Sequence, residues 1–236
     1  MNLHLAHCRG QCSTVWCGIM TKRLTAQDWI DFALTTLKHE GFGALKADVL
    51  ARKLGVTRGS FYWHFTDLGT FHVRVIEHWR EMATEAIIAD LERYDSVGER
   101  LEALARRAYG HSAVLEIRMR TWADNNADAA RALRDIDRRR REYLERLLVE
   151  AGIVQPLAAT RAQLLYWTYL GAKLSRSKLT GERLDRIVAE LTLIGLGGSR
   201  GRPAVTDDSH QRRLSRGSRI GPAAAWWDRN KQTHGT

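Results

Sequence analysis

Apolar residues recur along the chain at the three- and four-residue spacing of helices, and no long stretch alternates apolar and polar residues as a half-buried strand would. A first helix is predicted after Thr25, a good N-cap residue, and it ends at Gly41. Further helices are predicted at 47–54, from Thr57 to about Phe65, from Thr66 or Asp67 to about Tyr94, and at roughly 98–110, 112–123, 126–151, 157–178 and 181–195. The predicted fold class is therefore all-α.

The segment 51–65 has the pattern of two short helices that cross at a tight turn. Ala51 is small where the helices would cross, and Gly55 can end the first helix with a positive φ. Val56 is expected to be buried at the turn. Thr57 is expected to cap the second helix, whose free N-terminal amides suit phosphate or a DNA groove.

The second of these helices is predicted to have one buried and one outward side. Phe61 and Phe65 are four residues apart and are expected to face the core. An ordinary helical hairpin is the alternative, but adjacent exposed aromatic residues are costly unless a partner covers them. The outward side carries hydrogen-bonding and aromatic residues: Arg58, Gly59, Ser60, Tyr62, Trp63 and His64.

This segment resembles the signature of the TetR (tetracycline-repressor-like) family. The small residue, the Gly-Val turn and the Tyr-x-His-Phe ending match at Ala51, Gly55, Val56, Tyr62, His64 and Phe65. The resemblance implies a three-helix helix-turn-helix DNA-binding domain at 20–66 and a helical ligand-binding and dimerisation domain at 67–198. It also implies a homodimeric repressor that binds a palindromic operator and is released by a small-molecule effector.

On this resemblance, the helix at 57–64 enters the major groove of double-stranded operator DNA. Arg58, Ser60 and Trp63 would face base edges. The phosphate-binding residues would be Tyr62 and His64, with Lys46 and Thr25 as further candidates. The sequence departs from the family at Leu68, where Lys or Arg is usual, and at Lys46, where Ser or Thr is common.

The second half of the chain supplies the remaining expected sites. The effector pocket is expected among the central helices, although aromatic residues at helical spacing more often belong to a core. Its candidate residues are Tyr109, His111, Trp122, Tyr166 and Trp167. The last two helices are expected to form a four-helix dimer interface, with closure of a monomeric core as the alternative. Their candidate interface residues are Leu164, Leu170, Gly171, Leu174, Leu184, Ile187, Val188 and Leu191.

Charge adds less to this picture than its total suggests. The formal net charge is +10, but residues 1–23 carry +3 and residues 199–236 carry +5, which leaves +2 for the rest. Residues 1–19 are interpreted as a leader, with Met20 as the expected true start, and 199–236 as a disordered basic tail. The arginine run 138–141 is interpreted as a solvated helix face with i,i+4 ion pairs rather than an anion patch.

The remaining chemistry is sparse. The sequence lacks the common hydrolase, nucleotide-binding and metalloprotease motifs, so no enzyme and no cofactor is predicted. No apolar run is long enough for a membrane helix, and the three cysteines suggest a reducing cytoplasm. A metal-responsive regulator is the alternative function, although the spacing of its ligands matches no standard site. Those ligands would be His4, His7, Cys8, Cys12 and Cys17.

Overall fold

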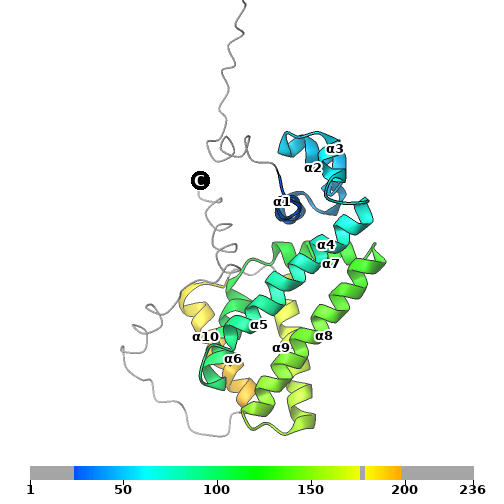
Figure 1. Ribbon diagram of the computed structural model, residues 1–236. Helices are drawn as coiled ribbons and strands as arrows, with labels where there is room; N and C mark the ends of the chain where they lie inside the picture. The colour runs from blue at the N-terminus through cyan, green and yellow to red at the C-terminus, as the bar shows by residue number, and fades with distance from the viewer. Residues whose placement is uncertain (1–23, 176–178, 198–236) are drawn as a thin grey trace, which may run out of the picture.

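The computed structural model describes residues 24–175 and 179–197, and every regular element among them is helical (Figure 1). The predictions for the leader, for the basic tail and for the N-terminal cysteines and histidines concern residues outside the described ranges. No helix in the described ranges is both long and apolar enough to span a membrane. The helices are α1 (Ala26–Glu40), α2 (Ala47–Leu54), α3 (Arg58–Tyr62), α4 (Leu68–Arg80), α5 (Ala86–Leu91), α6 (Val97–Gly110), α7 (Val114–Ala123), α8 (Ala127–Glu150), α9 (Gln155–Leu174) and α10 (Gly181–Leu196).

Helix α1 begins and ends as its sequence predicts. Thr25 Oγ1 accepts a hydrogen bond from the Asp28 amide at 3.2 Å, and the Asp28 carboxylate accepts one from the Thr25 amide at 2.7 Å. This reciprocal pair is a capping box, which satisfies two amides that no helical carbonyl can reach. Gly41 ends the helix at φ 84°, a value that favours glycine. A short 3₁₀ turn, Phe42–Ala44, then leads to α2.

The α2–α3 turn has the predicted geometry, with one difference at its cap. Gly55 takes the left-handed conformation (φ 69°, ψ 26°), and its amide bonds back to α2. Thr57 is the N-cap residue of α3, but its side chain makes no capping hydrogen bond. Phe61 and Phe65 are buried as expected, and their rings pack on Phe71 of α4 at 5.0 and 4.8 Å. These contacts fix the orientation of α3 on the rest of the domain.

The predicted long helix is present but is not a uniform α-helix. Asp67 caps α4 by accepting a hydrogen bond from the Thr70 amide at 2.7 Å. Between α4 and α5 the backbone forms a π-helical turn, Glu81–Glu85. Such turns insert one residue into a helix and occur often at functional sites. In Figure 1 this helix runs from the helix-turn-helix domain into the larger bundle.

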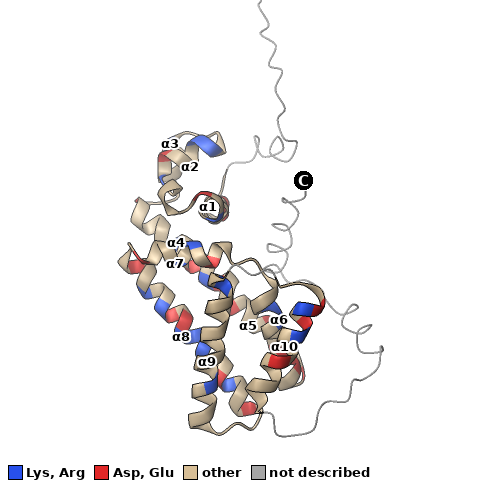
Figure 2. Ribbon diagram, turned by 180° about the vertical axis from the view of Figure 1, so that it is seen from behind, with Lys and Arg blue, Asp and Glu red and all other residues tan. Residues whose placement is uncertain are grey.

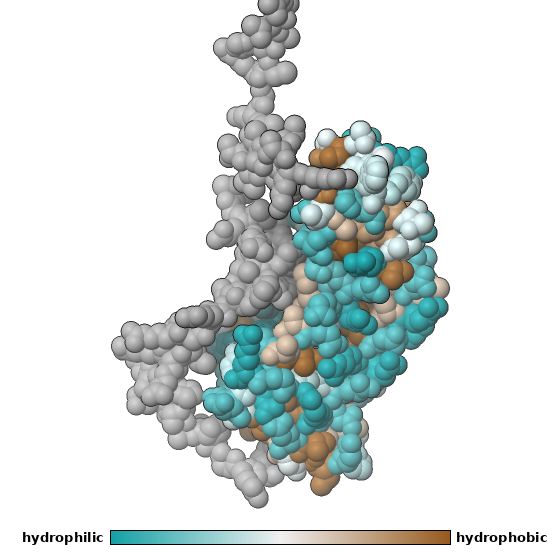
Figure 3. All heavy atoms as spheres, viewed as in Figure 1, coloured by the Kyte–Doolittle hydropathy of each residue, from teal (hydrophilic) through white to brown (hydrophobic). Residues whose placement is uncertain are grey.

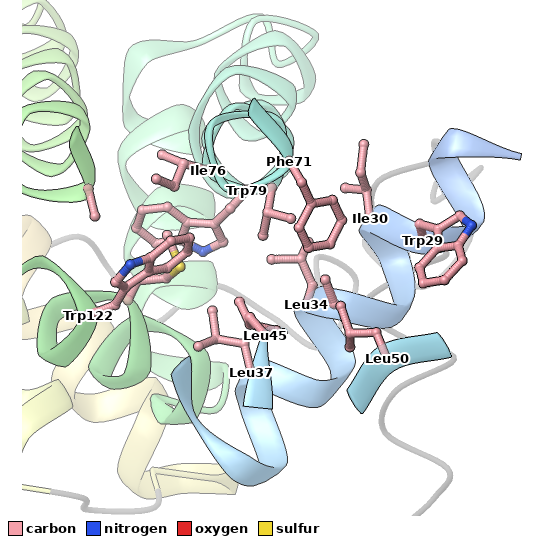
Figure 4. Close-up of a cluster of buried hydrophobic side chains, with 14 of the residues drawn as sticks. Trp29, Ile30, Leu34, Leu37, Leu45, Leu50, Phe71, Ile76, Trp79 and Trp122 are labelled. Atoms are coloured by element: carbon pink, nitrogen blue, oxygen red, sulfur yellow. The ribbon is translucent and has the colours of Figure 1, made fainter. Parts of the chain in front are cut away.

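Two clusters of buried side chains hold the molecule together. The larger one joins α1–α4 to α7 and α8, and Figure 4 shows Trp79 and Trp122 on one side of it and Trp29 on the other. The ring of Phe42 stacks on Trp122 of α7, with centroids 4.7 Å apart. The smaller cluster joins α5, α6, α8 and α9. The N-terminal helices therefore share a core with the bundle, and α1 packs directly against α7.

Candidate functional site

The outward side of α3 and the residues just after it form the first candidate site. Trp63 is 79% exposed and Tyr62 is 46% exposed, whereas the neighbouring Phe61 is fully buried. The Arg58 guanidinium donates a hydrogen bond to the Tyr62 hydroxyl at 3.0 Å and lies over its ring. Arg58 and Gly59 are exposed, and Ser60 and His64 are half-buried. These residues, which were predicted from the sequence to contact DNA, therefore lie on one accessible surface.

The two predicted phosphate contacts outside residues 58–64, Lys46 and Thr25, differ in whether the side chain is available to a phosphate. Lys46 is exposed at the N-cap position of α2, where a phosphate can reach it. The Thr25 hydroxyl donates to Asp28 at 2.7 Å, so the capping box already uses it. Leu68, which replaces the basic residue usual in the resembling family, packs half-buried against the larger cluster. The Leu68 side chain therefore contributes to apolar packing and offers no charge to a phosphate.

A second candidate site is a cavity of about 910 Å³ inside the bundle. Its walls come from the end of α4, the π-helical turn, α5, α6, α7, α8, α9 and α10, and Gln27 and Asp31 of α1 also contribute. The volume is near the upper end of that found for small-molecule sites. Three of the predicted pocket residues, Tyr109, His111 and Tyr166, line it.

The other two predicted pocket residues are placed elsewhere, and the prediction was wrong for both. Trp122 is buried in the larger cluster, where it stacks on Phe42 and meets His72 edge-on. Trp167 is 60% exposed on the outer side of α9. Both lie on helices that contribute to the cavity region, but each is on the wrong face of its helix.

A buried ion-pair network forms part of the cavity wall. The Glu116 carboxylate accepts hydrogen bonds from Arg120 at 2.7 Å and from Arg140 at 3.1 Å. Arg120 also bonds to Asp137 at 2.8 Å, and the Tyr166 hydroxyl donates to the same carboxylate at 2.6 Å. Burial alone would raise the pKa of Glu116, but the charges of Arg140 and Arg120 outweigh it and lower that pKa. Glu116 is therefore a buried carboxylate that stays ionised.

Arg140 connects this network to the π-helical turn. Its guanidinium donates to the Thr84 hydroxyl at 3.0 Å and to the Ala83 carbonyl at 3.2 Å. Arg140 is also within the run that was interpreted as a solvated face, and for this residue that interpretation was wrong. It holds for Arg138, which is 60% exposed and pairs with Asp135. Figure 2 shows acidic and basic residues interleaved along α8.

Lys173 is a further cavity residue that was not singled out from the sequence. It is only 7% exposed on α9, and its Nζ donates to the His111 carbonyl at 2.8 Å. Burial lowers the pKa of Lys173 to about 8, with a further lowering by Arg140 and an opposing effect of Glu116. Nearby, burial raises the pKa of the Tyr109 hydroxyl to about 12. A lysine inside an apolar stretch of helix was the available sequence signal.

The last two helices present apolar residues to the surface, but not all of those predicted. On α9, Leu164 and Leu174 are exposed, Gly171 is exposed, and Leu170 is half-buried. Other exposed apolar residues gather where α8 gives way to α9 (Figure 3), among them Val149, Val154 and Leu157.

On α10 the predicted interface residues pack toward their own chain, and for the fully buried Val188 the prediction was wrong. Val188 is 1% exposed, Leu191 lines the cavity, Leu184 packs close to Gly110 of α6, and Ile187 is half-buried. The exposed apolar residues of α10 are instead Leu193, Ile194 and Leu196.

No cluster of three or more potential metal ligands occurs in the described ranges. The histidines and cysteines of the metal-responsive alternative lie outside those ranges, so that alternative gains no support.

Comparison with known proteins agrees with this arrangement. Residues 30–67 match the model of the bacterial regulatory proteins of the tetR family. No protein of curated function matches the sequence. A transcriptional regulator from Rhodococcus sp. Rha1 superposes with a TM-score of 0.64 at 19% identity, covering 76% of this chain and all of the other.

Two further solved structures have the same fold. The reduced form of NemR from E. coli gives a TM-score of 0.59 at 21% identity, covering 71% of this chain and 96% of that one. The fatty acid degradation regulator FadR from Bacillus halodurans gives 0.55 at 18% identity, covering 73% and 98%. At these identities the likeness concerns the fold, and the match at 30–67 concerns the family. The helix-turn-helix segment of this chain is thus similar to the tetR family of bacterial regulatory proteins, and the described residues share the fold of solved transcriptional regulators.

Proposed function

We propose that the protein is a homodimeric repressor that binds a palindromic operator through α3 and is released when a small molecule fills the bundle cavity. The observation that carries the DNA-binding part is the exposed Arg58–Tyr62–Trp63 surface, which buried Phe61 and Phe65 hold rigidly on the domain. Arg58, Ser60 and Trp63 would contact bases. Tyr62, His64 and Lys46 would contact phosphates, with Gly59 and Thr57 allowing close approach of the backbone.

The dimer would form through the outer faces of α9 and α10. A palindromic site needs two reading helices about 34 Å apart, the spacing of one DNA turn. The exposed residues Leu164, Trp167 and Leu174 of α9 and the exposed end of α10 offer the apolar surface that such an interface requires. Gly171 would let the facing helix approach closely, because nothing lies within 4 Å of the position of an added Cβ.

Release would follow from how the cavity meets the DNA-binding domain. Its wall includes α1 residues, and the His78 ring of α4 bonds to Asp31 of α1 at 2.9 Å. The π-helical turn and α7 also line the cavity, and Trp122 of α7 stacks on Phe42, which lies between α1 and α2. A ligand that moves these elements would change the separation of the two reading helices, and a dimer that loses one half-site loses most of its affinity.

The test uses the promoter region of the protein's own gene in a gel-shift or anisotropy assay. Tyr62→Ala and Trp63→Ala are each expected to weaken binding by about fivefold or more, because each contact contributes roughly 1–3 kcal/mol. Arg131→Ala is the control, since Arg131 is 70% exposed on α8 and its ion-pair partner within the described part of the chain is the exposed Asp128. Sedimentation should show unchanged dimers in all three variants. Unchanged affinity of both α3 variants would refute the assignment of α3 as the reading helix.

A further inference from the structure

Lys173 carries a buried positive charge that the described residues do not neutralise. Its Nζ makes one hydrogen bond, to the His111 carbonyl, and lies 5.4 Å from the centre of the Tyr169 ring. Among residues 24–175 and 179–197, no carboxylate lies within ion-pair distance of it. A buried cation without an anion is unfavourable, so such a group usually has a partner or a function.

The neighbouring charges are already balanced without Lys173. Arg120 and Arg140 share Glu116, and Arg120 also pairs with Asp137. Two guanidinium groups and two carboxylates thus close a neutral network. Protonated Lys173 leaves this end of the cavity with one excess positive charge, and one bound anion would cancel it.

A second polar group in the same cavity also lacks a partner. The Tyr109 hydroxyl is buried and makes no hydrogen bond in the described structure. Tyr109 meets Tyr169 edge-on at 6.3 Å, and Lys173 lies over that same Tyr169 ring. An unpaired hydroxyl donor and an unneutralised ammonium therefore flank one aromatic ring. The cavity wall also carries apolar residues, among them Leu101, Leu104, Ala108, Leu144, Leu165 and Leu191.

We propose that the cavity binds an amphipathic monoanion, whose carboxylate is held by Lys173 and Tyr109 while its apolar body lies between α5, α6, α8 and α10. This inference rests on the proposed function, in which the cavity is the effector site. The carboxylate would accept hydrogen bonds from the Lys173 ammonium and the Tyr109 hydroxyl, which are the two donors left over. Glu116 would not repel it strongly, because Arg120 and Arg140 already neutralise that charge.

A purely structural role for Lys173 would be to cap the C-terminal end of α6 through the His111 carbonyl. Such a cap needs a single donor and no charge. Lys173→Gln separates the two roles, because glutamine retains an N–H donor and removes the charge. Lys173→Arg retains the charge.

The probes are 4-(1-pyrenyl)butanoate and 4-(1-pyrenyl)butan-1-ol, which share one fluorescent apolar body and differ in the carboxylate. The full-length wild-type protein is expected to bind the acid at least about tenfold more tightly than the alcohol at pH 7, because a charge-assisted hydrogen bond contributes about 1.5–3 kcal/mol. Lys173→Gln should reduce this ratio to about one with little change for the alcohol. Lys173→Arg and the charge-matched surface control Arg131→Gln should keep the preference.

Two further measurements keep the proposal open to refutation if Lys173→Gln does not fold. Calorimetry of the wild type at pH 8, in two buffers of different ionisation enthalpy, should show proton uptake with the acid and none with the alcohol. Uptake is expected because an anion favours protonated Lys173; Glu116, Arg140, Tyr169, Tyr109 and His111 are the other titratable or charged groups near it. Ala108→Trp should fill the cavity and abolish binding of both probes.

Equal affinity of the wild type for acid and alcohol, or a preference that survives Lys173→Gln or Ala108→Trp, would overturn the proposal. Operator binding is measured separately and without probe. A protein that binds its operator but shows no acid preference would refute the ligand class alone. A protein that prefers the acid but binds no operator would refute the proposed function alone.

Discussion

The most informative perturbation of the fold is Glu116→Gln, which keeps the shape of the side chain and removes its charge. Glu116 is 8% exposed and receives hydrogen bonds from both Arg120 and Arg140. In the variant Arg120 keeps Asp137, but Arg140 loses its carboxylate and is left with neutral partners, among them the Thr84 hydroxyl and the Ala83 carbonyl. Breaking a buried ion pair by removing one partner costs about 3–5 kcal/mol, so the free energy of unfolding should fall by about that amount.

Urea unfolding followed by far-UV circular dichroism measures this loss, at one fixed protomer concentration because a dimer unfolds in a concentration-dependent way. The matched control is Glu142→Gln on α8. Its carboxylate is 3.7 Å from Arg138, and both side chains are more than half exposed. An exposed i,i+4 pair contributes about 0.5 kcal/mol or less. Equal losses in the two variants would refute the view that Glu116 neutralises Arg140.

The dependence of the free energy of unfolding on pH, measured below about pH 5, tests the role of ionised Glu116 independently. The pKa of Glu116 is lowered in the folded state, since the attraction of Arg140 and Arg120 outweighs burial. The folded protein therefore binds fewer protons at this site than the unfolded chain near pH 4. The stabilisation is fully present above the unfolded pKa of about 4.3 and is lost as pH falls through the lower folded value. Glu116→Gln should flatten this part of the profile.

Three other substitutions test separate parts of the structure. Gly55→Ala should destabilise the protein by about 1 kcal/mol in urea unfolding, because φ is 69° there, whereas Gly43→Ala, with open space around its Cβ and no positive φ, should not. Trp122→Ala should cost about 3–5 kcal/mol by the same measurement, because the ring is fully buried and stacks on Phe42; a loss below 1 kcal/mol would contradict that packing. Trp167→Glu should convert dimers to monomers in sedimentation without loss of helix content, and persistent dimers at micromolar concentration would refute the proposed interface.

Helix limits and the helix-turn-helix were predictable because short-range chemistry determines them. The Thr25–Asp28 cap and the positive φ of Gly55 depend on residues within four positions of one another. The four-residue spacing of Phe61 and Phe65 likewise predicts that both face the core, although the ring that covers them, Phe71, comes from α4. The π-helical turn 81–85 was not predictable in this way. One inserted residue hardly changes the apolar spacing on either side, and its stabilising contacts come from α8.

The sequence did not show whether an apolar helix face packs inside its own chain or against a second protomer, because both environments require the same kinds of residue. The stripe that contains Val188 and Leu191 is apolar because it packs on α6 and the cavity, but an interface with a second protomer would require the same residues. Periodicity identifies which side of a helix is covered and not what covers it. The same ambiguity misplaced Trp122 and Trp167, whose size predicts burial or contact without naming the partner.

Arg140 shows that the sequence held more information than its composition suggested. Four consecutive helical residues point in four directions about 100° apart, so the run 138–141 cannot lie wholly on one solvated face. Arg140 is four residues after Ile136 and three before Tyr143, and both of these are buried. The spacing therefore places the guanidinium on the covered stripe, and a covered arginine requires a carboxylate. The identity of that carboxylate, Glu116, depends on how α7 packs against α8, which no local pattern specifies.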